Sequence, residues 1–127
     1  MKSEQSFPAT PASVKRARTF LASVLAGEPD DVVEAATLMV SELATNAVRH
    51  TGKPFSVVLD RTGRSLRVEV KDGGGGTPTL RHARPTEPSG RGLRIVDELS
   101  SDWGYTEQRH GTTVWFTMRL GQAARSS

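Results

Sequence analysis

Apolar residues recur at three- and four-residue steps in two segments near the N-terminus, a spacing that predicts helices. The first predicted helix covers residues 14–26 and ends at Gly27. The second begins near Pro29 and Asp30 and runs to about His50, where the segment 51–54 ends it. Its apolar stripe consists of Val32, Val33, Ala36, Met39, Val40, Leu43 and Ala47.

The pattern changes to strand periodicity after residue 54. Segments 55–60 and 65–71 read as two strands joined by a hairpin connection over 61–64. In the second of them Leu66, Val68 and Val70 alternate with charged residues, which indicates that one face is buried. A third helix is expected over 93–99, and a closing hairpin over 103–108 and 112–120.

This order of elements predicts an α+β fold. Strands adjacent in sequence can pair antiparallel, so we expect a two-layer α/β sandwich with a mixed, mostly antiparallel sheet and helices on one face. A single domain would span 14–120. Residues 1–13 would form a flexible arm or an edge strand near Phe7, residues 77–89 a loop, and residues 121–127 a disordered tail.

Composition narrows the classes of function. The 127 residues carry 17 basic and 14 acidic side chains, and no basic run exceeds two residues, which argues against direct nucleic-acid binding. There is no cysteine, so disulfides and thiolate metal sites are excluded, and a cytoplasmic protein is expected. The N-terminus lacks a signal-peptide pattern, and no apolar run is long enough to span a membrane.

Three short segments carry candidate chemistry. Glu42 and Asn46 lie four residues apart on the second helix, so they project on the same side. A carboxamide oxygen suits Mg²⁺, and a carboxylate one turn away can accept a proton. Asp72 ends a strand before four glycines and could accept a hydrogen bond from an exocyclic amine. The pair on the helix also fits an ordinary solvated face, and Asp72 fits a surface turn.

The third segment is Gly90-Arg91-Gly92, which precedes a predicted helix. Free N–H groups at a helix N-terminus favour phosphate, although Gly-x-Gly alone is a weak signal. No P-loop, Rossmann fingerprint or nucleophile elbow is present. The three histidines, His50, His82 and His110, have no spacing typical of a zinc site.

Taken together and in order, these segments resemble the boxes of the histidine-kinase-like ATPase superfamily, the GHKL or Bergerat fold. Residues 41–50 look like its N box, 72–76 and 90–93 like its two glycine boxes, and 111–116 like its late Gly-Thr segment. The resemblance covers roughly residues 7–120. With no phosphoacceptor hairpin before the domain and no transducer domain after it, the sequence is most similar to stand-alone anti-sigma factor serine/threonine kinases of actinomycete type.

The resemblance implies roles for particular residues. Glu42 would be the catalytic base, and Asn46 would bind the Mg²⁺ that bridges the phosphates of ATP. Asp72 would hold the adenine amine, and positive charge near the γ-phosphate could come from Arg81, Arg84 or Arg91. The remaining ATP-binding positions that the boxes imply are Gly74, Gly76, Gly90, Gly92, Leu93 and one or both of Thr112 and Thr113.

The same resemblance implies a function. The chain would bind a sigma factor and phosphorylate a serine of an anti-anti-sigma partner of the STAS type, with ATP and Mg²⁺ as cofactors and no membrane or nucleic-acid partner. Homodimers are frequent among such relatives. Two alternatives stay open, namely a nucleotide-binding regulator that sequesters a partner without kinase activity, and a slow ATPase.

Overall fold

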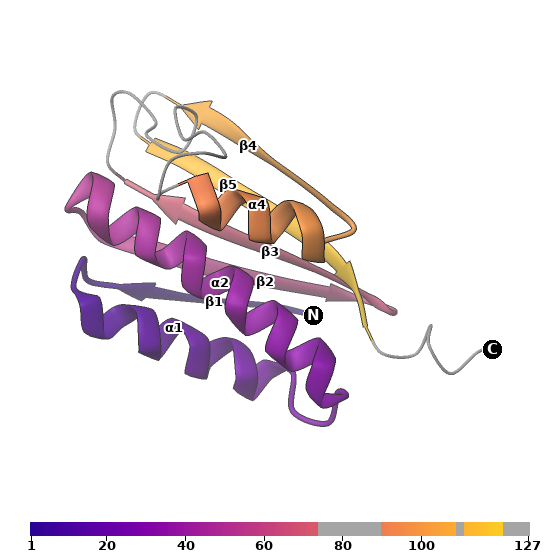
Figure 1. Cartoon of the computed structure of the whole chain (residues 1–127). Helices are drawn as coiled ribbons and strands as arrows, with labels where there is room; N and C mark the ends of the chain where they lie inside the picture. The colour runs from indigo at the N-terminus through magenta and orange to yellow at the C-terminus, as the bar shows by residue number, and fades with distance from the viewer. Residues whose placement is uncertain (74–89, 109–110, 121–127) are drawn as a thin grey trace.

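A computed structural model describes residues 1–73, 90–108 and 111–120, with the backbone alone for residues 50, 90–94 and 107–108. Figure 1 shows the arrangement of the helices and strands in this part of the chain. In chain order they are β1 (Lys2–Phe7), α1 (Pro11–Val24), α2 (Asp30–Thr51), β2 (Phe55–Thr62), β3 (Ser65–Asp72), α4 (Gly90–Leu99), β4 (Asp102–Gln108) and β5 (Gly111–Arg119). No helix in the described ranges is long and apolar enough to cross a membrane.

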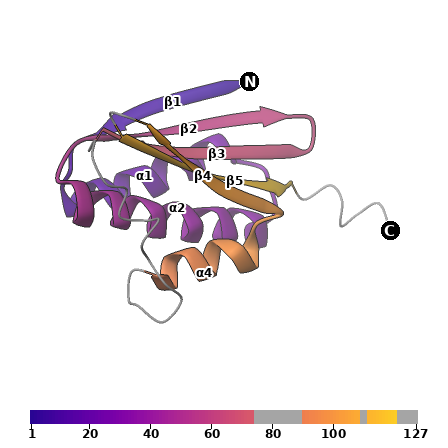
Figure 2. The ribbon, with the colours of Figure 1, turned by 90° about the horizontal axis from the view of Figure 1, so that it is seen from above.

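The strands form one sheet in the order β1-β2-β3-β5-β4. Each of the four neighbouring pairs is antiparallel. Helices α1, α2 and α4 all cover the same face of this sheet (Figures 1 and 2). The predicted α+β two-layer sandwich is therefore confirmed, and the described sheet is antiparallel throughout rather than mixed.

Several element boundaries differ from those predicted. The N-terminal segment forms a strand that pairs with β2, which is one of the two alternatives for residues 1–13. Helix α1 begins at Pro11 rather than residue 14, because proline fits the first turn, where its missing N–H is no loss. The predicted connection over 61–64 is too long. Strand pairing continues to Thr62, and Gly63 makes the tight turn with a φ of 58°.

The core lies between the helices and the inner face of the sheet. Leu66, Val68 and Val70 of β3 are buried there, as their alternation predicts, and Phe116 of β5 lies beside them. At the β1 edge, the ring of Phe7 stacks on Phe55 with 5.4 Å between centroids. These aromatic and aliphatic contacts fix the helices against the sheet, since burying each such side chain contributes about 1.5–3 kcal/mol.

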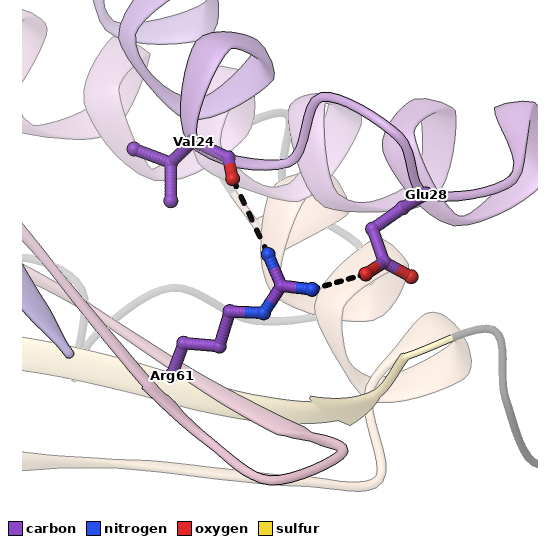
Figure 3. Close-up of polar contacts among 3 residues, drawn as sticks. All are labelled: Val24, Glu28 and Arg61. Carbon is purple, nitrogen blue, oxygen red and sulfur yellow. Dashed lines mark hydrogen bonds and ion pairs between the residues drawn. The ribbon is translucent and has the colours of Figure 1, made fainter.

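A polar contact joins the helical layer to the sheet at the end where α1 stops (Figure 3). The guanidinium of Arg61 on β2 forms an ion pair with the carboxylate of Glu28, in the turn between α1 and α2. Its second amino group donates to the carbonyl of Val24 at 3.4 Å. The α1–α2 turn is thereby held against the sheet.

The outer face of the sheet has a different character. The guanidinium of Arg67 lies 4.3 Å from the ring centre of Trp115 and donates to Glu69 at 2.9 Å. The indole of Trp115 lies against Gly104 of the neighbouring strand, where an added Cβ would be 2.9 Å from the ring. Glycine is thus needed at position 104 to seat Trp115.

Candidate functional site

Several sequence-predicted site residues meet at one end of the molecule. Figure 1 shows that α2 ends, β3 ends, β5 begins and α4 begins at this end. The antiparallel arrangement explains it, since β3 runs toward this end and β5 runs away from it. Segments far apart in sequence, such as the end of α2 at Thr51 and the start of β5 at Gly111, are thus brought to the same end.

Asn46 is a buried polar residue on α2, with 4% of its surface exposed. Its Nδ2 atom is inaccessible to solvent and has no hydrogen-bond partner among the described residues. A buried amide left without a partner costs about 1–3 kcal/mol. A half-turn of the carboxamide exchanges its nitrogen and oxygen, so a ligand at this position can be met by either atom. Asn46 therefore has the property expected of a residue that awaits a polar ligand.

Glu42 lies one helical turn before Asn46 and is half-buried. The helix that carries both residues ends in a defined way. The Thr51 hydroxyl donates to the carbonyl of Ala47 at 2.8 Å, and Gly52 takes a left-handed conformation with φ of 66° and ψ of 13°. This ending fixes the C-terminal part of α2, and with it Asn46, relative to strand β2.

Asp72 and Thr112 lie opposite each other on β3 and β5 as paired residues. Both belong to the face of the sheet that the helices cover, because Val70 and Val114, two positions along each strand, are buried in the core. Thr112 is 4% exposed. Thr113 points to the opposite face, so of the two threonines only Thr112 stands on the side of Asp72 and Asn46.

Gly111 is a site residue to which the sequence analysis assigned no role. Its φ is +155°, and a Cβ there would overlap the carbonyl oxygen of Asp72 and lie 3.3 Å from the Cα of Gly73. Only glycine allows β5 to begin this close to the end of β3. The Gly-Thr dipeptide was visible in the sequence. The steric need for glycine at position 111 becomes clear only from the pairing of β3 with β5.

The residues of the second glycine box lie at the start of helix α4. Gly90 and Gly92 lie within its first turn rather than ahead of it, so the predicted start of the helix at residue 93 was too late. Val96 is fully buried in the core, and the indole N–H of Trp103 donates to Asp97 at 2.9 Å. These contacts hold α4 in the helical layer. Its N-terminus lies at the end where α2, the helix that carries Asn46, stops (Figure 1).

Some predicted residues fall outside what the structure describes. Gly74, Gly76, Arg81 and Arg84 lie in the range 74–89, outside the described residues. For Arg91 and Leu93 the structure gives the helical backbone only. The described part of the site therefore consists of the end of α2, the Asp72–Thr112 pair and the first turn of α4.

The chemistry of this arrangement suits a nucleotide with a divalent cation. The free N–H groups of the first turn of a helix favour phosphate. Mg²⁺ commonly takes one or two protein oxygens and fills its shell with phosphate oxygens and water, a demand that the carboxamide of Asn46 fits. Asp72 is an acceptor at the strand end, and the Thr112 hydroxyl can both donate and accept.

Comparisons with known proteins bear on the family and the fold of the domain. The family model of the histidine kinase-like ATPase domain matches residues 7–118. No curated protein matches the chain. The solved structure of the RsbU and RsbW domains of Rv1364c from Mycobacterium tuberculosis is similar, with a TM-score of 0.75 and 23% identity over 94% of this chain. This chain covers 32% of that one, so it spans about a third of its length.

Two further solved structures share the fold. The histidine kinase domain from the Erythrobacter litoralis EL346 blue-light activated histidine kinase has a TM-score of 0.58 and 26% identity, covering 91% of this chain and 63% of that one. The Acinetobacter baumannii histidine kinase AdeS has a TM-score of 0.55 and 10% identity, covering 94% of this chain and 68% of that one. Because the family model spans nearly the whole described domain, this chain belongs to the histidine kinase-like ATPase domain family.

Proposed function

We propose that this chain binds ATP with Mg²⁺ and acts as a serine/threonine kinase of an anti-sigma system. It would hold a sigma factor and phosphorylate a serine of an anti-anti-sigma partner. The family match supports nucleotide binding, and the similar structure that contains an RsbW domain favours the anti-sigma kinase-like type. The kinase activity, the serine specificity and the partners are parts of the proposal.

The observation that carries the proposal is the buried carboxamide of Asn46, whose Nδ2 has no partner among the described residues. A purely structural asparagine at 4% exposure is expected to be hydrogen-bonded by the protein. An unpaired one, at the end of the fold where Asp72, Thr112 and the first turn of α4 also lie, fits a ligand that supplies the missing contacts. Mg²⁺, when bound, would neutralise charge on the phosphates.

Different residues of the chain would bind the cation, the adenine and the phosphates. Asn46 would supply an oxygen to the cation, Asp72 and Thr112 would hold the adenine, and the N–H groups of the first turn of α4 would hold phosphate. Glu42 would take the proton from the attacking serine hydroxyl. The serine oxygen then bonds to the γ-phosphorus while the bond from that phosphorus to the bridging oxygen breaks, and ADP leaves.

The kinase step is tested by Glu42→Gln, with Glu34→Gln as the matched control. Both residues are carboxylates on α2, but Glu34 is exposed and lies two turns earlier, away from Asn46. The assay follows label from γ-labelled ATP onto a protein that co-purifies with the tagged chain. We expect Glu42→Gln to keep nucleotide affinity and to lower the transfer rate by at least about a hundredfold, the usual size of a general-base contribution.

Each outcome bears on a different part of the proposal. Transfer by Glu42→Gln at the wild-type rate would show that Glu42 is not the base. ATP binding by the wild-type chain without label on any co-purifying protein would instead favour a nucleotide-binding regulator without kinase activity. Release of free phosphate in the absence of partners would favour a slow ATPase.

A further inference from the structure

A pocket lies at the end of the sheet opposite to the candidate site. It has a volume of about 320 Å³ and forms where β3 begins, β5 ends and the α4–β4 turn lies against β5. Figure 1 shows this end of the sheet, where β5 leaves toward the C-terminus. Its lining residues are Arg64, Ser65, Ser101, Thr117, Met118 and Arg119.

The two arginines of the pocket are held side by side by the backbone. Ser65 and Arg119 are paired residues on β3 and β5. The N–H of Leu120 donates to the carbonyl of Arg64 at 2.8 Å, which continues the strand pairing into the turn. The backbones of the two arginines are therefore adjacent, and both residues line the pocket.

Neither arginine has a counter-ion within the described residues. The structure gives ion pairs to Arg61 and Arg67, with Glu28 and Glu69, and none to Arg64 or Arg119. No carboxylate lines the pocket. The acidic residue that pairs with Thr117 in the sheet is Asp102, whose Oδ1 accepts the N–H of Trp103 at 2.9 Å. The pocket therefore carries an excess of positive charge, whereas Arg61 and Arg67 each form an ion pair with a glutamate.

Three residues that carry hydroxyl groups complete the polar lining, namely Ser65, Ser101 and Thr117. The described hydrogen bonds use many serine and threonine side chains elsewhere, for example Ser6 with Ser56 and Thr51 with Ala47. None is formed by the three hydroxyls of the pocket. The backbone N–H of Ser101 donates to the carbonyl of Thr117 at 2.8 Å, so these two residues are held together while their side chains stay available.

From this combination we infer that the pocket is a binding site for a phosphate-type oxyanion, carried by a small molecule or by a phosphorylated side chain. Guanidinium groups bind phosphate through two parallel N–H donors, and charge-assisted bonds of this kind are about twice as strong as neutral ones. Hydroxyls add donors at positions that the guanidinium groups leave open. The site binds its ligand by charge and hydrogen bonding, and Met118 is the apolar residue of its lining.

This anion pocket is separate from the nucleotide site. Ser65 and Asp72 are the first and last residues of the eight-residue strand β3. A strand rises about 3.4 Å per residue, so the two ends lie roughly 24 Å apart. The ten-residue helix α4 likewise separates its first turn from Ser101 by about 15 Å. A nucleotide held by Asp72 and the first turn of α4 therefore lies away from the pocket. The inference stands whether or not the proposed kinase activity is correct.

The test is an NMR titration of the full chain with inorganic phosphate at constant ionic strength. The double variant Arg64→Ala/Arg119→Ala removes the proposed anchors. Its matched control is Arg16→Ala/Arg18→Ala, which removes the same charge from two exposed positions on α1. A third variant, Arg64→Lys/Arg119→Lys, keeps the charge and loses the paired donors. Melting temperatures of all variants establish that each is folded.

We expect saturable shifts of the amide signals of Ser65, Ser101 and Thr117 in the wild type and in the α1 control. The Arg64→Ala/Arg119→Ala variant should bind at least about tenfold more weakly, which corresponds to about 1.4 kcal/mol, and the lysine variant should be intermediate. The inference is overturned if these signals do not saturate at tens of millimolar phosphate, or if the folded alanine variant binds as well as the control.

A second arm distinguishes the two sources of the oxyanion. A short phosphoserine peptide and its unphosphorylated twin are titrated in the same way. Tighter binding of the phosphopeptide than of inorganic phosphate assigns the pocket to a phosphorylated side chain, and weaker binding assigns it to a free anion. Equal binding of the two peptides would show that the phosphate is not recognised, and would contradict the inference.

Discussion

Asp72 and Thr112 face each other across strands β3 and β5, on the side of the sheet that the helices cover. The pairing places a carboxylate and a buried hydroxyl at one point, where an adenine could meet both. Thr113, the next residue, lies on the other face because side chains alternate along a strand. Of the two candidate threonines, Thr112 is therefore the one that we expect to contact the adenine.

We therefore predict that Thr112→Val weakens ATP binding and that Thr113→Val does not. Each substitution replaces a hydroxyl by a methyl group, so the two variants differ in the face they alter. Loss of one hydrogen bond of about 1 kcal/mol corresponds to about a fivefold rise in Kd. Calorimetric titration of both variants measures it. An equal effect of both substitutions, or a larger effect of Thr113→Val, would contradict the assignment.

Gly111→Ala is predicted to disturb the same site by displacing the backbone of Asp72. A Cβ at this position overlaps the carbonyl of Asp72, so the end of β3 must shift and the adenine contact with it. Gly63→Ala is the control, since Gly63 also has a positive φ of 58° but has open space around it, far from the site. We expect each variant to lose roughly 1 kcal/mol or more of stability through backbone strain.

Only Gly111→Ala should also weaken nucleotide binding. The free energy of unfolding comes from urea titration, and the affinity from calorimetry on the folded variants. If Gly63→Ala reduces ATP affinity as much as Gly111→Ala does, the effect of position 111 is one of general stability and not of the position of Asp72.

The ion pair between Arg61 and Glu28 is predicted to stabilise the fold without touching the site. The side chains are 30% and 14% exposed, so the pair is only partly screened by solvent. A double-mutant cycle with Arg61→Gln and Glu28→Gln should give a coupling energy of about 1 kcal/mol that falls as salt is raised. ATP affinity should be unchanged in all three variants. A coupling energy near zero at low salt would show that the contact is incidental.

Much of the fold could be predicted from the sequence, because an element with one buried face has apolar residues at a regular spacing. Leu66, Val68 and Val70 alternate with charged residues, and the structure buries all three. Helix α2 was likewise evident from its apolar stripe. Its start at Asp30 also agrees with the prediction. The early starts of α1 at Pro11 and of α4 at Gly90 were harder to place, since proline and glycine fit both a loop and a first helical turn.

The unpredicted features depend on contacts between distant segments. The sequence indicated Asn46 as a candidate ligand, but not that its Nδ2 is buried without a partner among the described residues, because burial comes from elements elsewhere in the chain. The same holds for Gly111, whose constraint comes from Asp72, and for the pairing of Arg61 with Glu28. The anion pocket joins Arg64 and Arg119, which no spacing in the sequence connects.

The central claim is that Asn46 is kept for a Mg²⁺-bound nucleotide and not for stability. Its buried Nδ2 has no hydrogen-bond partner in the part of the chain that the structure describes. Asn46→Ala should therefore leave the free energy of unfolding of the ligand-free protein within about 1 kcal/mol of wild type, or raise it. Loss of nucleotide binding together with retained stability would separate a functional role from a structural one.

The most direct measurement is calorimetric titration of the wild type and Asn46→Ala with ATP, with and without Mg²⁺. We predict that the wild type binds ATP more tightly when Mg²⁺ is present, and that the folded Asn46→Ala variant loses this Mg²⁺-dependent gain. Absence of binding by the wild type at millimolar ATP with Mg²⁺, or an undiminished Mg²⁺ effect in the variant, would contradict the account.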